Sequence, residues 1–188
     1  FREGRNSREV LDFNLYLSPN DVWTAALVPA DATGGANTPG RLLTADASCT
    51  NPLIPAGGVN FRNFAYADAN DDGGGETLDR TREGYLEMIE MANIVDDGAA
   101  PNYEAAAIHD AGVPDNCALL RGTNLAASAA FLADLQPPSG GLSGTGTLIN
   151  VQNGSDTGYN AVALANFTTS IIYTDVGNEA GNLTQADP

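Results

Sequence analysis

The chain has 188 residues, of which 43% are hydrophobic and only 17% charged, the composition of a folded domain rather than of a disordered segment. The chain has 24 acidic residues and only eight basic ones, all arginine, so its net charge is −16. Such an acidic surface repels phosphate backbones and anionic lipid, which disfavours nucleic-acid partners. No stretch reaches the roughly 20 apolar residues of a membrane helix, so no membrane insertion is expected. The length predicts a single domain, residues 1–188.

The N-terminal segment predicts a β-hairpin. Residues 1–2 look like the end of a strand and residues 3–7 like the turn after it, which predicts a longer chain that continues upstream. Apolar and polar side chains alternate over residues 11–17, the period of a strand with one buried face. The Ser-Pro-Asn-Asp sequence at 18–21 suits a type I turn, and residues 22–28 predict a second strand. We therefore expect these two strands to pair with each other.

The middle of the chain is less regular. Residues 29–63 are rich in Gly, Pro, Ala, Asn and Thr, which predicts long loops with one short strand at 41–44. Residues 84–95 carry apolar side chains at helical spacing and contain good helix formers. Their β-rich surroundings and the preceding glycine favour a strand, which is the expectation we adopt.

Two short helices are expected next. Residues 101–112 combine Asn102 as a cap, an alanine-rich body and Gly112 as a stop signal. A second helix is expected to begin at Asn124 and to end before Pro137, because the residue before a proline disfavours helix.

The C-terminal part predicts strands again. Asn153-Gly154 is a hairpin signal between strands at 145–152 and 159–167, and residues 170–174 predict one more strand. Strands at both ends with irregular segments between them predict a mainly β fold. We expect a β-sandwich or jelly-roll-like domain with long loops and one or two short inserted helices.

Two cysteines, Cys49 and Cys117, lie in loop-like contexts. An even number of cysteines in an acidic chain of this kind predicts one disulfide, although two unrelated thiols are the alternative. A disulfide predicts an extracellular or cell-surface location. Three Asn-X-Ser/Thr sequences fit an exported protein and are candidate glycosylation sites: Asn153, Asn166 and Asn182.

An acidic glycine-rich loop at residues 68–79 resembles a calcium-binding loop. Its oxygen-bearing side chains recur at the spacing of an EF-hand loop, with Gly73 at the sharp turn. The match is partial, because position 12 is an aspartate rather than a glutamate and no flanking helix pair is evident. A solvated acidic loop is the alternative. The candidate calcium ligands are Asp68, Asn70, Asp72, Glu76 and Asp79.

Catalytic patterns are weak. Glu83, Glu87 and Glu90 could supply a glycosidase pair, but hydrolysis needs two carboxyls about 5–9 Å apart on one cleft wall. Along a strand, Glu87 and Glu90 point to opposite faces. His109 is the only histidine and lies in a predicted helix. These patterns predict no catalytic residues.

Two blocks of the sequence carry a resemblance. They are FREGRNSREVLDFNLYLSPNDVWTAAL at 1–27 and REGYLEMIEM at 82–91, followed by Asn116-Cys117. They resemble a group of uncharacterised secreted or surface proteins of Gram-negative bacteria, in which R-F-R-x-G-x-x-S-x-x-V-L-D-F-x-x-x-L-S-P-x-D-x-W precedes G-Y-x-E-x-I-E-M. The resemblance covers about a third of the chain and implies an extracellular β-rich protein with no assigned reaction.

The sequence is compatible with three functions. The preferred one is a non-enzymatic structural or interaction protein that self-assembles with other protein subunits in a surface layer, filament or envelope assembly. It follows from the low charge density, the abundance of small polar residues and the predicted disulfide. The alternative is a calcium-dependent binding module, with carbohydrate as one ligand class. The second alternative is a glycoside hydrolase-like enzyme.

Overall fold

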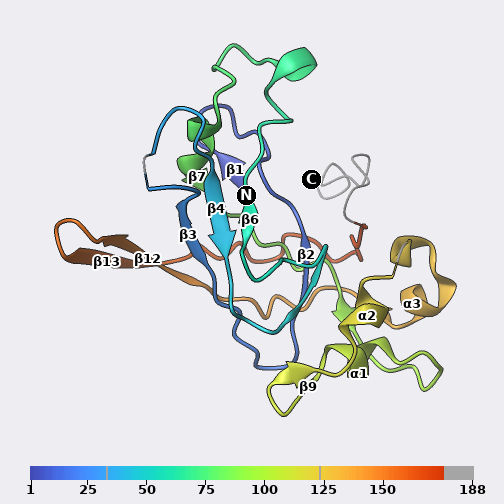
Figure 1. Ribbon diagram of the computed structural model, residues 1–188. Helices are drawn as coiled ribbons and strands as arrows, with labels where there is room; N and C mark the ends of the chain where they lie inside the picture. The colour runs from blue at the N-terminus through green and yellow to red at the C-terminus, as the bar shows by residue number, and fades with distance from the viewer. Residues whose placement is uncertain (33, 123, 176–188) are drawn as a thin grey trace.

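The computed structural model describes residues 1–32, 34–122 and 124–175 (Figure 1). Within these ranges the protein is mainly β, built from small antiparallel sheets and three short α-helices. They do not close into a sandwich or jelly roll. None of the described helices is long and apolar enough to cross a membrane.

The sheets pair segments that are mostly far apart in sequence. The three-stranded sheet has the order β3 (Ala26–Pro29), β4 (Gly40–Leu43), β6 (Val59–Asn60). The two-stranded pairs are β1 (Arg2–Glu3) with β7 (Gly84–Tyr85), β2 (Asn14–Tyr16) with β5 (Cys49–Asn51), β8 (Asn93–Ile94) with β11 (Leu135–Gln136), β9 (His109–Asp110) with β10 (Val113–Pro114), and β12 (Thr145–Asn150) with β13 (Ser155–Asn160).

The predicted N-terminal hairpin is wrong in its pairing. Strands do form within both predicted segments, as β2 and β3, and a turn forms between them with Asp21 N–H donating to Ser18 O at 3.1 Å. It is not the expected type I turn, because Asn20 at its third position has a positive φ of 62°. However, β2 pairs with β5 and β3 pairs with β4. After the turn, the N–H of Thr24 donates to the carboxylate of Asp46 at 3.1 Å rather than to the preceding strand. An alternating pattern specifies which face is buried but not which strand is the neighbour.

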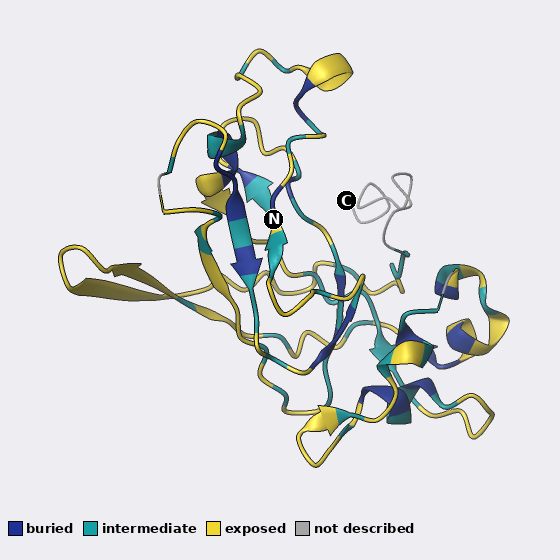
Figure 2. Cartoon of the chain, viewed as in Figure 1, coloured by how far each residue is buried: buried dark blue, intermediate teal, exposed yellow. Residues whose placement is uncertain are grey.

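The described part has two hydrophobic cores rather than one. The first lies under the helices and includes Tyr16, Cys49, Leu120 and Phe131. The second lies between β4 and the N-terminal segment and includes Val10, Leu42, Phe61 and Tyr66. Figure 2 shows buried residues on β2, β4 and the helices, whereas the β12–β13 hairpin is exposed along its length. Two small cores suit a chain whose sheets have only two or three strands.

The predicted helices are only partly confirmed. Asn102 caps α1 (Tyr103–Ala107), accepting a hydrogen bond from Ala105 N–H at 2.7 Å. The helix stops earlier than expected, since the following residues form the β9–β10 hairpin, with Gly112 at its turn. The second predicted helix is interrupted: η3 (Leu125–Ala127) is a 3-10 turn, and α3 (Ala129–Ala133) begins anew with its own cap, Ser128. An unpredicted third helix, α2 (Cys117–Leu120), is capped by Asn116.

Other expectations have mixed outcomes. The short strand near 41–44 is confirmed as β4. The strand expected at 84–95 forms only at its two ends, as β7 and β8, which pair with different strands. The hairpin around Asn153-Gly154 is confirmed, although β13 lies earlier than expected, and residues 170–174 form no strand.

Candidate functional site

The acidic loop is organised around an arginine. Arg80, on the 3-10 helix η2 (Leu78–Arg82), donates from Nη1 to Asp72 Oδ1 at 2.8 Å and from Nη2 to Asp72 Oδ2 at 2.7 Å. It also donates from Nη1 to the carbonyl of Gly75 at 2.9 Å. Any side chain at Gly74 would come within 2.6 Å of the Arg80 guanidinium. The glycines therefore let the loop close tightly on this cation.

The other side of Arg80 contacts the N-terminal turn. Arg80 Nε donates to Glu3 Oε2 at 2.8 Å, and the guanidinium lies 4.1 Å from the centre of the Tyr66 ring. Arg80 is 8% exposed and Glu3 is fully buried. The Glu3 carboxylate also accepts hydrogen bonds from the backbone N–H groups of three nearby residues, Arg5, Asn6 and Arg8. These hydrogen bonds to Glu3 stabilise the turn that the sequence predicts at residues 3–7.

The electrostatics of this cluster follow from its partners. Burial alone would raise the pKa of Glu3, but the hydrogen bonds from Arg80 and from the turn lower it to about 2. The Arg80 guanidinium holds the pKa of Asp72 well below its usual range. Both carboxylates are therefore ionised in the folded protein, and they share one protein cation, Arg80.

The predicted calcium ligands are not brought together. Asp72 faces Arg80 and also lies 3.3 Å from Arg8 Nε. The side-chain amide of Asn70 donates to the carbonyl of Phe64 at 2.9 Å, and Asp79 pairs with Arg82 at 3.9 Å. Across the described ranges, no three His, Cys, Asp or Glu side chains are grouped so as to hold a metal ion. A calcium site at this loop stays a prediction without geometric support.

Calcium is expected to leave thermal unfolding unchanged, because the central carboxylate of the loop is neutralised by Arg80. Calorimetry in calcium and in an equal concentration of magnesium measures this, with Asp68→Ala as the comparison variant. If calcium raises the melting temperature of the wild type but not that of Asp68→Ala, the loop binds calcium after all.

The three glutamates considered for hydrolysis each contact a different part of the chain. Glu87 pairs with Arg2 at 2.7 Å. The Glu90 carboxylate accepts four hydrogen bonds from residues 139–141, including Gly140 N–H at 2.6 Å. Glu83 is exposed, and its carbonyl accepts from Gly4 N–H. Glu90 therefore has a structural role, because it holds residues 139–141 in the segment that leads into β12.

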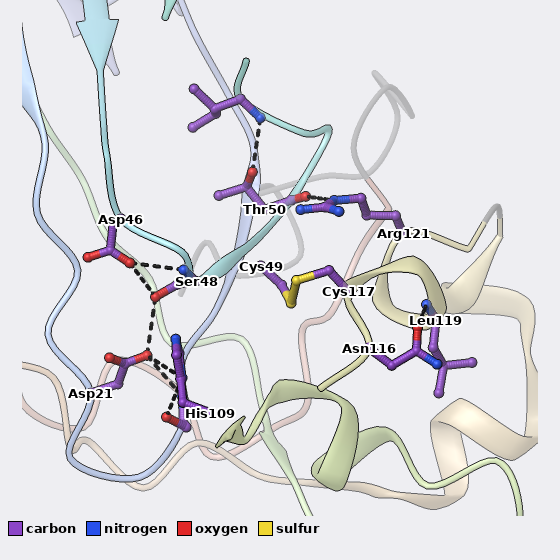
Figure 3. The surroundings of a disulfide bond; sticks show 12 residues. Asp21, Asp46, Ser48, Cys49, Thr50, His109, Asn116, Cys117, Leu119 and Arg121 are labelled. Carbon is purple, nitrogen blue, oxygen red and sulfur yellow. Dashed lines mark hydrogen bonds and ion pairs between the residues drawn. A yellow bond between two sulfur atoms is a disulfide. The ribbon is translucent and has the colours of Figure 1, made fainter. Parts of the chain in front are cut away.

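His109 belongs to a polar cluster that the sequence did not reveal (Figure 3). Its Nδ1 lies 3.0 Å from Ser18 Oγ and 3.5 Å from Asp21 Oδ2. Ser48 Oγ donates to Asp46 Oδ1 at 2.6 Å and lies 3.2 Å from Asp21 Oδ2. A hydrolytic triad needs the serine and the acid on different ring nitrogens, whereas both lie at Nδ1 here. The cluster joins the 18–21 turn to β9 and to the loop before β5.

The predicted disulfide is confirmed beside this cluster (Figure 3). Cys49, on β5, is bonded to Cys117, the first residue of α2, with a Cα–Cα distance of 5.3 Å. Cys49 is fully buried in the first core. Arg121 Nε donates to the carbonyl of Thr50 at 2.7 Å, a second tie between the helix and β5.

A long exposed element of the described chain is the β12–β13 hairpin, residues 145–160, which we call the arm. It extends away from the rest of the protein (Figure 1). Leu148 is 66% exposed, Ile149 70% and Val151 88%. Tyr159 lies across Gly146, where any side chain would meet its ring at 2.4 Å. The sequence around the arm is almost uncharged: between Leu135 and Thr174 the only charged residue is Asp156.

The candidate glycosylation sites fall on or after the arm. Asn153 is exposed in its turn, and Asn166 is exposed with a positive φ of 59°. Asn182 lies outside the described residues. Exposure leaves the first two open to modification without showing that it occurs.

Comparisons of the chain with protein-family models, with curated proteins and with solved structures find no match. The resemblance to secreted Gram-negative proteins therefore remains a prediction. The described chain defines a disulfide-bonded, mainly β protein with an exposed apolar arm, and its function is argued below from those features.

Proposed function

We propose that the protein is a non-enzymatic structural subunit that assembles with other copies of itself in a surface layer, filament or envelope assembly outside the cytoplasm. The disulfide supports the location, since disulfides persist in oxidising compartments. In such an assembly, strands from neighbouring copies would extend the small sheets toward the sandwich that the sequence predicts. The arm is the observation that carries the proposal.

The arm exposes apolar side chains on both of its faces. Leu148 and Ile149 are consecutive in β12, so they point to opposite sides of the ribbon. An isolated two-stranded hairpin is only marginally stable in water. A hairpin with exposed apolar residues on both faces gains stability when another surface covers it. The arm is therefore built for contact with a partner.

Removing the arm is expected to abolish assembly. Ala161 N–H donates to the carbonyl of Gly144 at 2.8 Å, so residues 145–160 can be replaced by a two-residue Asn-Gly turn without moving the body. Light scattering is expected to show particles well above the 19.4 kDa of one chain for the wild type, and the correspondingly smaller mass of a single shortened chain for the deletion. Circular dichroism checks that the deletion variant is folded.

A milder variant serves as a second test. Leu148→Thr with Ile149→Thr keeps strand propensity but removes the exposed apolar groups, and is expected to weaken assembly strongly. Val113→Thr, at a residue 55% exposed on β10, is the matched control and is expected to have no effect. A wild type that stays monomeric at high concentration would refute the proposed function.

A further inference from the structure

We infer that the arm of one copy binds the open edge of β3 in a second copy, so that copies join head to tail. The inference rests on the proposed function and adds to it the surface that receives the arm. The contact would be β-augmentation, in which main-chain hydrogen bonds supply affinity and side-chain pockets supply specificity.

β3 is an open and unprotected edge strand. Within the described residues it pairs only with β4, which leaves its other side free of strand partners. Its sequence, Ala26–Pro29, carries no charge, and Leu27 is 56% exposed. Edge strands are commonly protected by charged side chains, bulges or covering elements. Here only Pro29, at the end of the strand, limits pairing, so the preceding residues can accept another strand.

A shallow hollow lies at the end of this sheet, between the start of β3, the end of β4 and the loop before β6. Its volume is about 430 Å³, and its lining is small and uncharged: Thr24, Ala25, Ala26, Leu43, Thr44, Ala45 and Ala56. The arm presents the opposite shape, large apolar side chains on a narrow ribbon. Leu148, Ile149 and Tyr159 are each more than half exposed and could fill a hollow lined by alanines. Small residues on one surface and large ones on the other are complementary.

Charge favours a second copy as the occupant. A net charge of −16 makes two copies repel each other over most of their surfaces. The arm, with Asp156 as its only charge, and the uncharged hollow are surfaces where two copies can meet without this repulsion. The two surfaces differ, so the contact is heterologous and leads to a chain of copies unless the rotation closes a ring.

Cysteine cross-linking between two singly substituted proteins tests the contact. The two native cysteines are bonded to each other and none is free, so new thiols report cleanly. Leu148→Cys protein mixed with Leu27→Cys protein is expected to form a disulfide-linked dimer. Val113→Cys is the matched control, because Val113 and Leu27 are 55% and 56% exposed. The expected yield of linked dimer with Leu27→Cys is at least about tenfold higher than the yield with Val113→Cys, since binding raises the effective concentration of the two thiols.

Charged substitutions separate this inference from the proposed function. Leu27→Asp is expected to abolish assembly, and Val113→Asp to leave it unchanged, with melting temperatures confirming that both variants fold. If the wild type assembles through its arm but neither Leu27→Asp nor cross-linking singles out β3, the acceptor is elsewhere and only this inference is lost. If the wild type does not assemble at all, both proposals are wrong.

Discussion

Replacing Arg80 by methionine is expected to lower the free energy of unfolding by about 3–5 kcal/mol, the usual cost of breaking a buried ion pair by removing one partner. The substitution leaves the fully buried carboxylate of Glu3 without its cation. It also removes the two hydrogen bonds that fix Asp72 and the bond to the carbonyl of Gly75. The N-terminal turn and the acidic loop would loosen together. Urea unfolding of the two proteins measures the difference.

Arg82→Met is the matched control for this experiment. Arg82 ends the same 3-10 helix but is exposed, and its ion pair with Asp79 is long, at 3.9 Å. Exposed pairs of this kind contribute about 0–1 kcal/mol, so little change is expected. Calcium is not expected to restore the Arg80 variant. Equal losses in the two variants, or rescue by calcium, would show that the cluster is not organised around Arg80.

The same cluster predicts how stability depends on acid. The pKa of Glu3 is lower in the folded protein, about 2, than its ordinary value of 4.5. The unfolded chain therefore takes up the proton first, and protonation favours unfolding. The contribution of Glu3 is complete above about pH 4.5 and is lost as the pH falls toward 2. Glu3→Gln should be less stable at neutral pH and should lose less stability on acidification.

Local signals in the sequence predicted local structure well. Asn102 caps a helix and Asn153-Gly154 turns a hairpin, because each depends on hydrogen bonds and backbone angles within a few residues. The disulfide was predicted because Cys49 and Cys117 were the only candidates for each other. The pairing of β2 with β5 was missed, since no local pattern in residues 11–28 identifies a partner more than thirty residues away.

The acidic loop shows a second limit of sequence reasoning. The spacing of Asp68, Asn70 and Asp72 suggested calcium because these are oxygen donors around a glycine turn. The sequence does not show that Arg80 folds back onto Asp72, or that Glu3 approaches from the N-terminal turn. A guanidinium and a metal ion make similar demands on a loop, since both need several oxygens pointing inward. The same pattern therefore suits either cation.

Removing the disulfide is expected to cost about 4 kcal/mol, because opening a bridge between cysteines 68 residues apart releases a large loop in the unfolded chain. The variant is Cys49→Ala with Cys117→Ala, which avoids leaving a single reactive thiol. Chemical unfolding of the variant and of the oxidised wild type measures the loss. Reduced wild-type protein is the control and should match the double variant.

The loss of stability caused by removing the disulfide should also be uneven across the molecule. The bridge joins β5 to α2 inside the first core, next to Leu120 and Phe131. The second core, around Leu42 and Phe61, includes neither cysteine. Hydrogen exchange in the double variant should therefore speed up first in α1, α2 and α3, while β4 stays protected, because local opening follows the contacts that are lost. Uniform acceleration in both cores would mean that they unfold as one unit and that the disulfide stabilises the whole chain.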